Sequence, residues 1–67
     1  MIKNNLSKLM GEKRIKMSEL QRLAGLSEST IRRIYYDTSN NISYTTIDKL
    51  CKALDCNTQE LLEYIPD

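Results

Sequence analysis

The sequence predicts an all-α protein, and three observations support this fold class. The 67 residues contain only two glycines and one proline, so few positions would interrupt a helix. Apolar residues recur at spacings of three and four, which is the period of an amphipathic helix. The strict alternation of a β-strand is missing. We expect one domain over residues 1–67, with a small core and therefore marginal stability.

The first predicted helix covers about residues 4–13 and begins at Asn4 or Asn5. Its apolar face consists of Ile2, Leu6, Leu9 and Met10. Ile15 follows as a core residue of the connection.

A second, very short helix follows. Its apolar positions are Met17, Leu20, Leu23 and Ala24. Ser18 with Gln21 three residues later resembles a capping box, although Lys16 is an alternative boundary residue. Gly25 stands where a left-handed residue commonly ends a helix.

Ser27 is expected to cap a third helix over about residues 28–36, and Glu28 in its first turn complements the helix dipole. The inward side chains of this helix are Ile31, Ile34 and Tyr35. The segment "DTSNN" then predicts a polar loop over residues 37–41.

Two further helices complete the predicted set of five. Ser43 caps a fourth helix, whose apolar stripe is Tyr44, Ile47, Leu50, Cys51 and Leu54. Asn57 and Glu60 form a capping pair for the last helix, which Pro66 ends. The apolar residues of this last helix are Leu61, Leu62 and Ile65.

Composition argues against an enzyme. The chain has no histidine, which removes the usual general base and the commonest metal ligand. Cys51 and Cys56 cannot complete a structural zinc site, and a disulfide between them would close only a short loop. We expect reduced thiols, with Cys51 in the core and a redox-sensing Cys56 as the weaker alternative. We expect no catalytic residue, metal or cofactor.

Localisation is predicted from what the sequence lacks. No apolar run approaches the roughly 20 residues that span a membrane. The N-terminus has no signal-peptide pattern. The expected location is the cytoplasm, without a membrane partner.

Charge is distributed unevenly along the chain, although the net charge is only +1. Residues 1–33 contain eight Lys or Arg and three acids, which gives +5. Residues 34–67 contain two Lys and six acids, which gives −4. A half-chain of charge +5 on so small a domain would attract a polyanion, although ordinary surface variation also produces such a difference.

The third predicted helix has a polar outer face. At about 100° per residue, Ser29, Arg32, Arg33 and Tyr36 lie opposite Ile31, and Thr30 lies to one flank. Hydroxyls and guanidinium groups suit hydrogen bonds to phosphates and base edges. Together with the preceding helix and the Gly25 turn, this helix is expected to make a helix-turn-helix unit. In such units the second helix enters the DNA major groove, although αα-hairpins that do not bind DNA are also common.

The segment "MSELQRLAGLSESTIRRI" resembles the helix-turn-helix of the Xre family, the Cro and cI repressor type. Its matching positions are Leu20, Gly25, Ser27, Thr30, Ile31 and Ile34. The segment "SYTTIDKLCKALDCNTQELLEYI" is similar to the two closing helices of that family. The resemblance covers essentially the whole chain and implies a compact five-helix, lambda-repressor-like DNA-binding domain.

The resemblance also implies a set of DNA contacts. On the third helix these are Glu28, Ser29, Thr30, Arg32 and Arg33, to which we add Tyr36 from its exposure. Backbone-binding positions in and after the loop are Asn40, Asn41, Ser43 and Tyr44. Ser18 at the start of the second helix matches a phosphate contact.

Several of these roles have alternatives. Glu28 either accepts from a cytosine or only stabilises the helix dipole. Thr30 either contacts DNA or packs, and Tyr36 either meets DNA or is simply exposed. The sequence also departs from the family: Gln21 replaces a small alanine, and Met17 replaces the usual glutamine.

The sequence therefore predicts a sequence-specific regulator of transcription, a repressor, that binds double-stranded DNA as a homodimer. Leu62, Tyr64 and Ile65 are candidate interface residues, and the monomer core is an alternative place for Leu62. No small-molecule ligand is expected. The alternative function is a helical protein-interaction module, antitoxin-like or anti-repressor, that keeps the fold without reading DNA.

Overall fold

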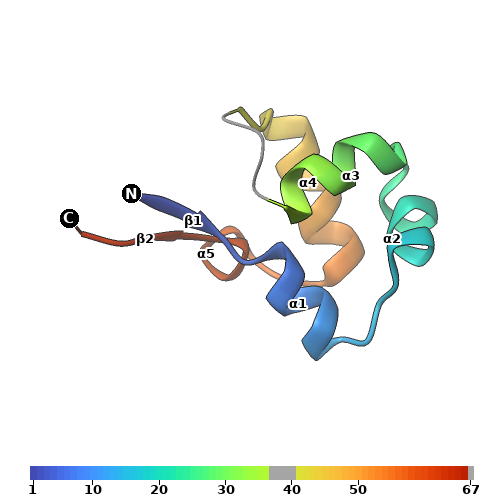
Figure 1. Cartoon of the computed structure of the whole chain (residues 1–67), viewed down its shortest axis with the longest axis horizontal. Helices are drawn as coiled ribbons and strands as arrows, with labels where there is room; N and C mark the ends of the chain where they lie inside the picture. The colour runs from blue at the N-terminus through green and yellow to red at the C-terminus, as the bar shows by residue number, and fades with distance from the viewer. Residues whose placement is uncertain (37–40, 67) are drawn as a thin grey trace.

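The computed structural model describes residues 1–36 and 41–66. In this part of the chain, one short strand comes first, five helices follow it, and a second short strand comes last (Figure 1). In chain order the elements are β1 (Ile2–Asn4), α1 (Leu6–Glu12), α2 (Met17–Ala24), α3 (Glu28–Tyr35), α4 (Tyr44–Leu54), α5 (Thr58–Leu61) and β2 (Leu62–Tyr64). The prediction of a mainly helical protein is confirmed for the interior of the chain.

The two ends of the chain differ from the all-α prediction because they form an antiparallel pair of strands. Ile2 lies opposite Tyr64, and Asn4 opposite Leu62. The first helix begins after Asn5 rather than at Asn4, and Ile2 is an exposed strand residue rather than part of the helix stripe. The last helix ends at Leu61, because the backbone of Leu62 is extended and this residue lies opposite Asn4 in the two-stranded sheet.

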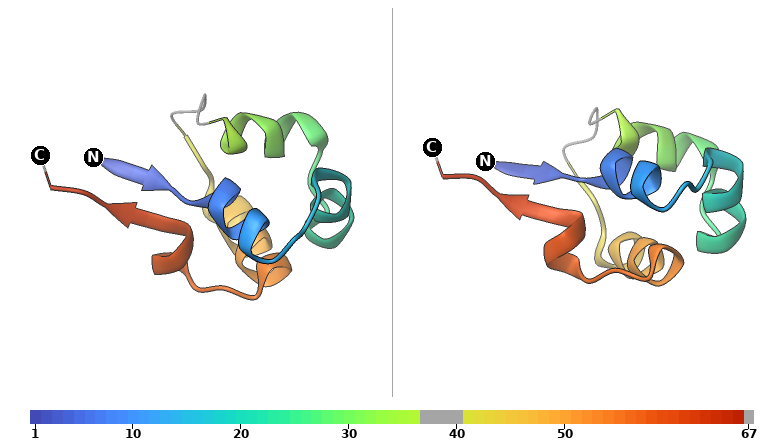
Figure 2. Two further views of the ribbon diagram at one scale, coloured as in Figure 1. Left: turned by 60° about the horizontal axis from the view of Figure 1, so that its bottom comes forward. Right: turned by 90° about the horizontal axis from the view of Figure 1, so that it is seen from below.

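The paired ends project from the helical part of the molecule, and both termini lie at the far end of this two-stranded ribbon (Figures 1 and 2). Asn5 anchors the base of the ribbon: its backbone N–H donates to the Leu61 carbonyl at 2.7 Å, and its side-chain amide donates to the Glu60 carbonyl at 3.2 Å. At the tip, the terminal ammonium of Met1 donates to the Ile65 carbonyl at 2.9 Å.

The helices enclose a single apolar core. Its buried side chains are Leu6, Leu9, Met10, Leu20, Ala24, Ile31, Ile34, Leu50, Leu54 and Leu61. The apolar periodicity predicted most of this set. Besides Ile2, two residues assigned to the inner stripes are exposed instead: Leu23 is 49% exposed and Tyr44 is 91% exposed. Tyr44 is the first residue of α4, and Leu23 is the second-last residue of α2.

Local hydrogen bonds fix where the helices begin. The Ser27 and Ser43 hydroxyls accept from the backbone N–H of the residue three positions later, at 3.2 and 3.1 Å, as the sequence predicts. The Asn57–Glu60 capping box is present, with bonds of 3.0 and 3.1 Å. The prediction of a Ser18–Gln21 capping box is wrong. Instead, the Glu19 carboxylate accepts a hydrogen bond from the Lys16 N–H at 3.4 Å, and α2 begins after Lys16, the alternative boundary residue.

Left-handed residues end three of the helices. Gly25 has φ 67°, as its position after α2 predicts. Arg14 and Asp55, with φ 54° and 50°, do the same after α1 and α4, where no glycine marks the end of the helix. At both sites the chain turns through a Schellman motif. The N–H after the left-handed residue donates to the carbonyl five residues earlier, and the N–H of the left-handed residue itself donates to the carbonyl three residues earlier.

Replacing Asp55 by glycine is expected to stabilise the protein. A left-handed conformation costs a residue with a Cβ about 1–2 kcal/mol, and the extra freedom of glycine in the unfolded chain offsets roughly 0.4–1 kcal/mol of the gain. Urea unfolding should therefore show a net increase of about 0.5–1 kcal/mol for Asp55→Gly. Asp55→Ala is the matched control, since it removes the same charge and keeps the strain. Equal stability of the two variants would contradict the prediction.

Among the described residues, no helix has both the length and the apolar character needed to cross a membrane.

Candidate nucleic-acid interface

Helix α3 presents a polar face to solvent, and its orientation follows from its apolar residues. Ile31 and Ile34 are buried in the core and fix which side of the helix faces inward. The outward side chains are Glu28, Ser29, Arg32, Arg33 and Tyr36, all of which are exposed. The predicted outer face of this helix is thus confirmed, and Thr30 is half-buried at its flank.

Glu28 and Arg32 form an ion pair on this face. They are one helical turn apart, and the guanidinium donates a hydrogen bond to the carboxylate. Both side chains remain more than half exposed, so the pair contributes little to stability. Its importance is electrostatic, because Arg32 neutralises the carboxylate that would otherwise repel an approaching phosphate.

Ser27 organises the start of α3 with two further contacts. Its hydroxyl oxygen lies 2.8 Å from the Thr30 hydroxyl oxygen and 3.2 Å from that of Ser29. The Thr30 hydroxyl is therefore engaged within the protein. This favours a supporting role for Thr30 and leaves Ser29 as the more exposed hydroxyl.

Loss of the Ser27 cap is expected to destabilise the protein by about 1 kcal/mol, because an N–H at the start of α3 loses its partner. Ser27→Ala should show this loss in urea unfolding. Ser27→Asn supplies another capping oxygen and should stay close to the wild type. A loss of the same size for both variants would mean that the cap is not the cause.

A polar hollow of about 200 Å³ lies between α3 and the start of α4. Its lining residues are Thr30, Arg33, Ile34, Asn41, Ile42, Ser43 and Thr46. The structure thus brings together four residues predicted separately as DNA contacts: Thr30, Arg33, Asn41 and Ser43. A guanidinium, an amide and several hydroxyls around one hollow at a helix N-terminus suit an anionic oxygen.

Thr46 is a member of this hollow that the sequence analysis missed. Its hydroxyl lies 2.9 Å from the Ser43 hydroxyl, as the Thr30 hydroxyl lies 2.8 Å from that of Ser27. The signal was present in the sequence, because Ser-x-x-Thr occurs at the start of both helices.

The helix-turn-helix formed by α2 and α3 agrees with comparison to known proteins. Residues 5–67 match the model of the Cro/C1-type HTH DNA-binding domain. The chain belongs to this family. It is also similar to the uncharacterized HTH-type transcriptional regulator YozG of Bacillus subtilis (strain 168), with 24% identity over 63 residues, which are 94% of this chain and 75% of YozG. The resemblance inferred from the helix-turn-helix motif is confirmed.

Six described residues predicted as contacts of this Cro/C1-type domain lie outside the hollow. Glu28, Ser29 and Arg32 are on the exposed face of α3, and the other three are Ser18, Tyr36 and Tyr44. Ser18 is exposed in the first turn of α2. Tyr44 borders an apolar groove between α4 and β2. Tyr36, 64% exposed, stacks edge-on against Tyr35 with ring centroids 5.0 Å apart. Asn40 lies outside the described residues.

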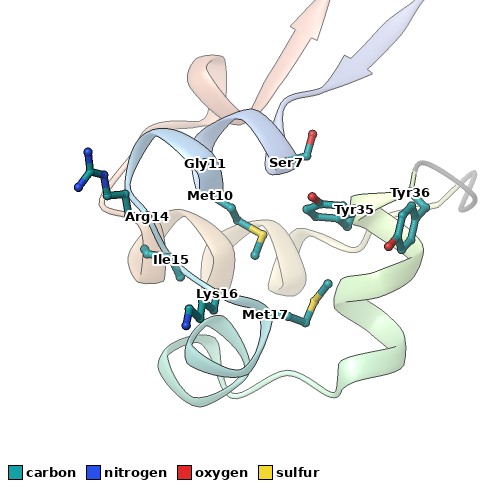
Figure 3. Close-up of a pocket in the computed structure, with 9 residues that line it drawn as sticks. All are labelled: Ser7, Met10, Gly11, Arg14, Ile15, Lys16, Met17, Tyr35 and Tyr36. Atoms are coloured by element: carbon teal, nitrogen blue, oxygen red, sulfur yellow. The ribbon is translucent and has the colours of Figure 1, made fainter.

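Tyr36 also lines a larger groove of about 510 Å³ beside the helix-turn-helix (Figure 3). Figure 3 shows the two tyrosines across from Met10 and Met17, whereas Arg14 and Lys16 extend from the connection between α1 and α2. This groove places two cations near the start of α2, the region where the resemblance implies a phosphate contact.

The part of the chain that the structure describes contains no cluster of three or more His, Cys, Asp or Glu side chains placed to hold a metal ion.

Proposed function

We propose that this Cro/C1-type domain is a sequence-specific transcriptional regulator, and specifically a repressor that acts in the cytoplasm. Helix α3 enters the major groove, and the polar hollow holds a backbone phosphate beside it. The observation that carries this assignment is the position of Arg33, which lies on the exposed face of α3 and also lines the hollow at the start of α4.

The assigned contacts divide into two groups. Ser29, Arg32 and Arg33 on the exposed face of α3 are the candidates for base contacts, since Arg pairs with guanine and Ser with several bases. The positioning contacts to phosphates come from Asn41 and Ser43 in the hollow. Further phosphate contacts come from three residues outside the hollow: Ser18, Tyr36 and Tyr44. Glu28 acts through its pair with Arg32 rather than by direct contact.

Binding to random duplex DNA at low salt tests the proposal, because binding by phosphate neutralisation must weaken steeply as the salt concentration rises. Sequences selected from a random pool then report whether one half-site or two are read. No binding to any duplex at low salt would overturn the proposal and leave a helical protein-interaction module as the function.

We further propose that the regulator binds DNA as a homodimer, because the small footprint of one domain gives limited affinity. A candidate interface is the surface made by two residues of β2, Leu62 and Tyr64, and by the neighbouring groove of about 450 Å³ beside α4, which Leu62 lines. Tyr64 is 67% exposed on β2, and among the described residues the sheet has two strands, so one edge of each is uncovered. Exposed strand edges favour pairing with another chain.

Tyr64→Lys is expected to shift the dimer to a monomer, since a charge is placed on the uncovered strand. Sedimentation equilibrium measures this shift. Lys8→Gln is the control, because Lys8 is exposed on α1 and borders neither groove. A wild-type protein that sediments as a monomer at high concentration, both free and on DNA, would contradict the dimer.

A further inference from the structure

The chain has two cysteines, and the structure places them together at the end of α4. Cys51 lies in the last turn of this helix, and Cys56 follows the turn that leads to α5. Both are half-buried free thiols. Neither borders the polar hollow, so the proposed DNA contacts do not use them.

The Schellman motif explains why residues five apart are in contact. The Cys56 N–H donates to the Cys51 carbonyl at 3.0 Å, and the Asp55 N–H donates to the Lys52 carbonyl at 3.3 Å. The left-handed Asp55 between them turns the chain back over the helix end. In this motif the side chains at the two outer positions normally form an apolar contact. Here these two positions hold the two cysteines.

A cation bonded to both sulfurs would replace the two thiol protons and neutralise the repulsion between the two thiolates.

We propose that Cys51 and Cys56 form a two-sulfur binding site for a thiophilic metal or metalloid ion, of which trivalent arsenic is the model. Two sulfurs do not complete the tetrahedral set of a structural zinc site, but they suit a soft centre that bonds two thiolates. The site is accessible in the single chain, since Cys51 lines the open groove beside α4, which is also the candidate dimer interface. The inference does not depend on the proposed function, because binding can be measured without DNA.

Phenylarsine oxide is the probe. Its arsenic forms one bond to each sulfur, its oxygen leaves as water with the two thiol protons, and arsenic stays trivalent throughout. Intact mass measurement should show one adduct per wild-type chain. Because the second bond is intramolecular, the wild type should bind about a hundredfold or more tightly than Cys51→Ser or Cys56→Ser, each of which keeps one thiol. Wild-type binding no tighter than in these variants would overturn the proposal.

A thermal unfolding experiment separates a folded site from a merely nearby pair of cysteines. A ligand that binds the folded chain more tightly than the unfolded chain raises the midpoint of unfolding. Phenylarsine oxide should therefore raise the midpoint of the wild type and leave that of Cys56→Ser unchanged. A wild-type midpoint that stays the same or falls would overturn the proposal, and this measurement does not require either variant to fold.

Discussion

Arg33→Ala is expected to weaken binding to a selected duplex by about tenfold or more. A well-placed arginine contact to a base or phosphate contributes about 1–3 kcal/mol. Arg33 is exposed on α3 and is the cation lining the polar hollow. Fluorescence anisotropy of a labelled duplex at one fixed salt concentration measures the change. Comparison with random duplex assigns the contact, since loss of a base contact lowers affinity mainly for the selected sequence.

Lys52→Ala is the matched control for charge. Lys52 pairs with Asp48 on α4 and borders neither the polar hollow nor the groove of about 510 Å³ beside the helix-turn-helix. It should change the affinity by less than about twofold, through long-range electrostatics alone. A similar loss for both variants would show that overall charge, rather than the position of Arg33, governs binding. Arg32 should be tested in a Glu28→Gln background, because removing it alone leaves an unneutralised carboxylate on the binding face.

Ile31→Ala is expected to remove much of the stability of the protein. Ile31 is fully buried, and truncation of a buried isoleucine to alanine costs about 2–5 kcal/mol. A chain of this length has a total stability of roughly 3–10 kcal/mol. At about 4–8 °C per kcal/mol for small domains, the thermal midpoint should fall by roughly 10–30 °C. Calorimetry or circular dichroism measures the fall.

Ile31→Val provides the graded control, with an expected loss of about 0.5–1.5 kcal/mol. At temperatures where both variants are folded, their DNA affinity should stay close to the wild type, since the side chain faces away from the polar face of α3. If Ile31→Ala left the midpoint unchanged, the assignment of this residue to the core would be wrong.

The sequence predicted well those features that depend on neighbouring residues. Ser27, Ser43 and Asn57 cap helices because their side chains bond to N–H groups three residues away. Gly25 ends α2 because it adopts a left-handed backbone without strain. Such interactions are contained in a short segment and are therefore visible in its residue types. Arg14 and Asp55 escaped detection because their left-handed conformations are imposed by the motif and not favoured by the residue.

Features that depend on distant residues could not be predicted. Each strand is three residues long, and its partner lies about sixty positions away in the chain. Leu61 and Leu62 carry the same apolar character, yet the first ends a helix and the second starts a strand. The deciding interaction is the pairing with residues 2–4, which no local pattern contains.

The candidate interface shows the same division. The exposed face of α3 followed from the 100° rotation per residue and was right for Ser29, Arg32 and Arg33. The hollow that joins Arg33 to Asn41, Ser43 and Thr46 depends on how α4 packs beside α3. The family resemblance predicts several residues of the hollow one by one. That these residues share one site does not follow from the sequence.

The ribbon also determines how the molecule can be extended or rearranged. Met1 and Ile65 exchange two hydrogen bonds, of 2.8 and 2.9 Å, so the backbone nearly forms a closed ring. A short linker could therefore join the ends, and the chain could be opened at another exposed turn to give a circular permutant. For the same reason, a domain fused to either end would leave the molecule from one common point, at the tip of the ribbon (Figure 1).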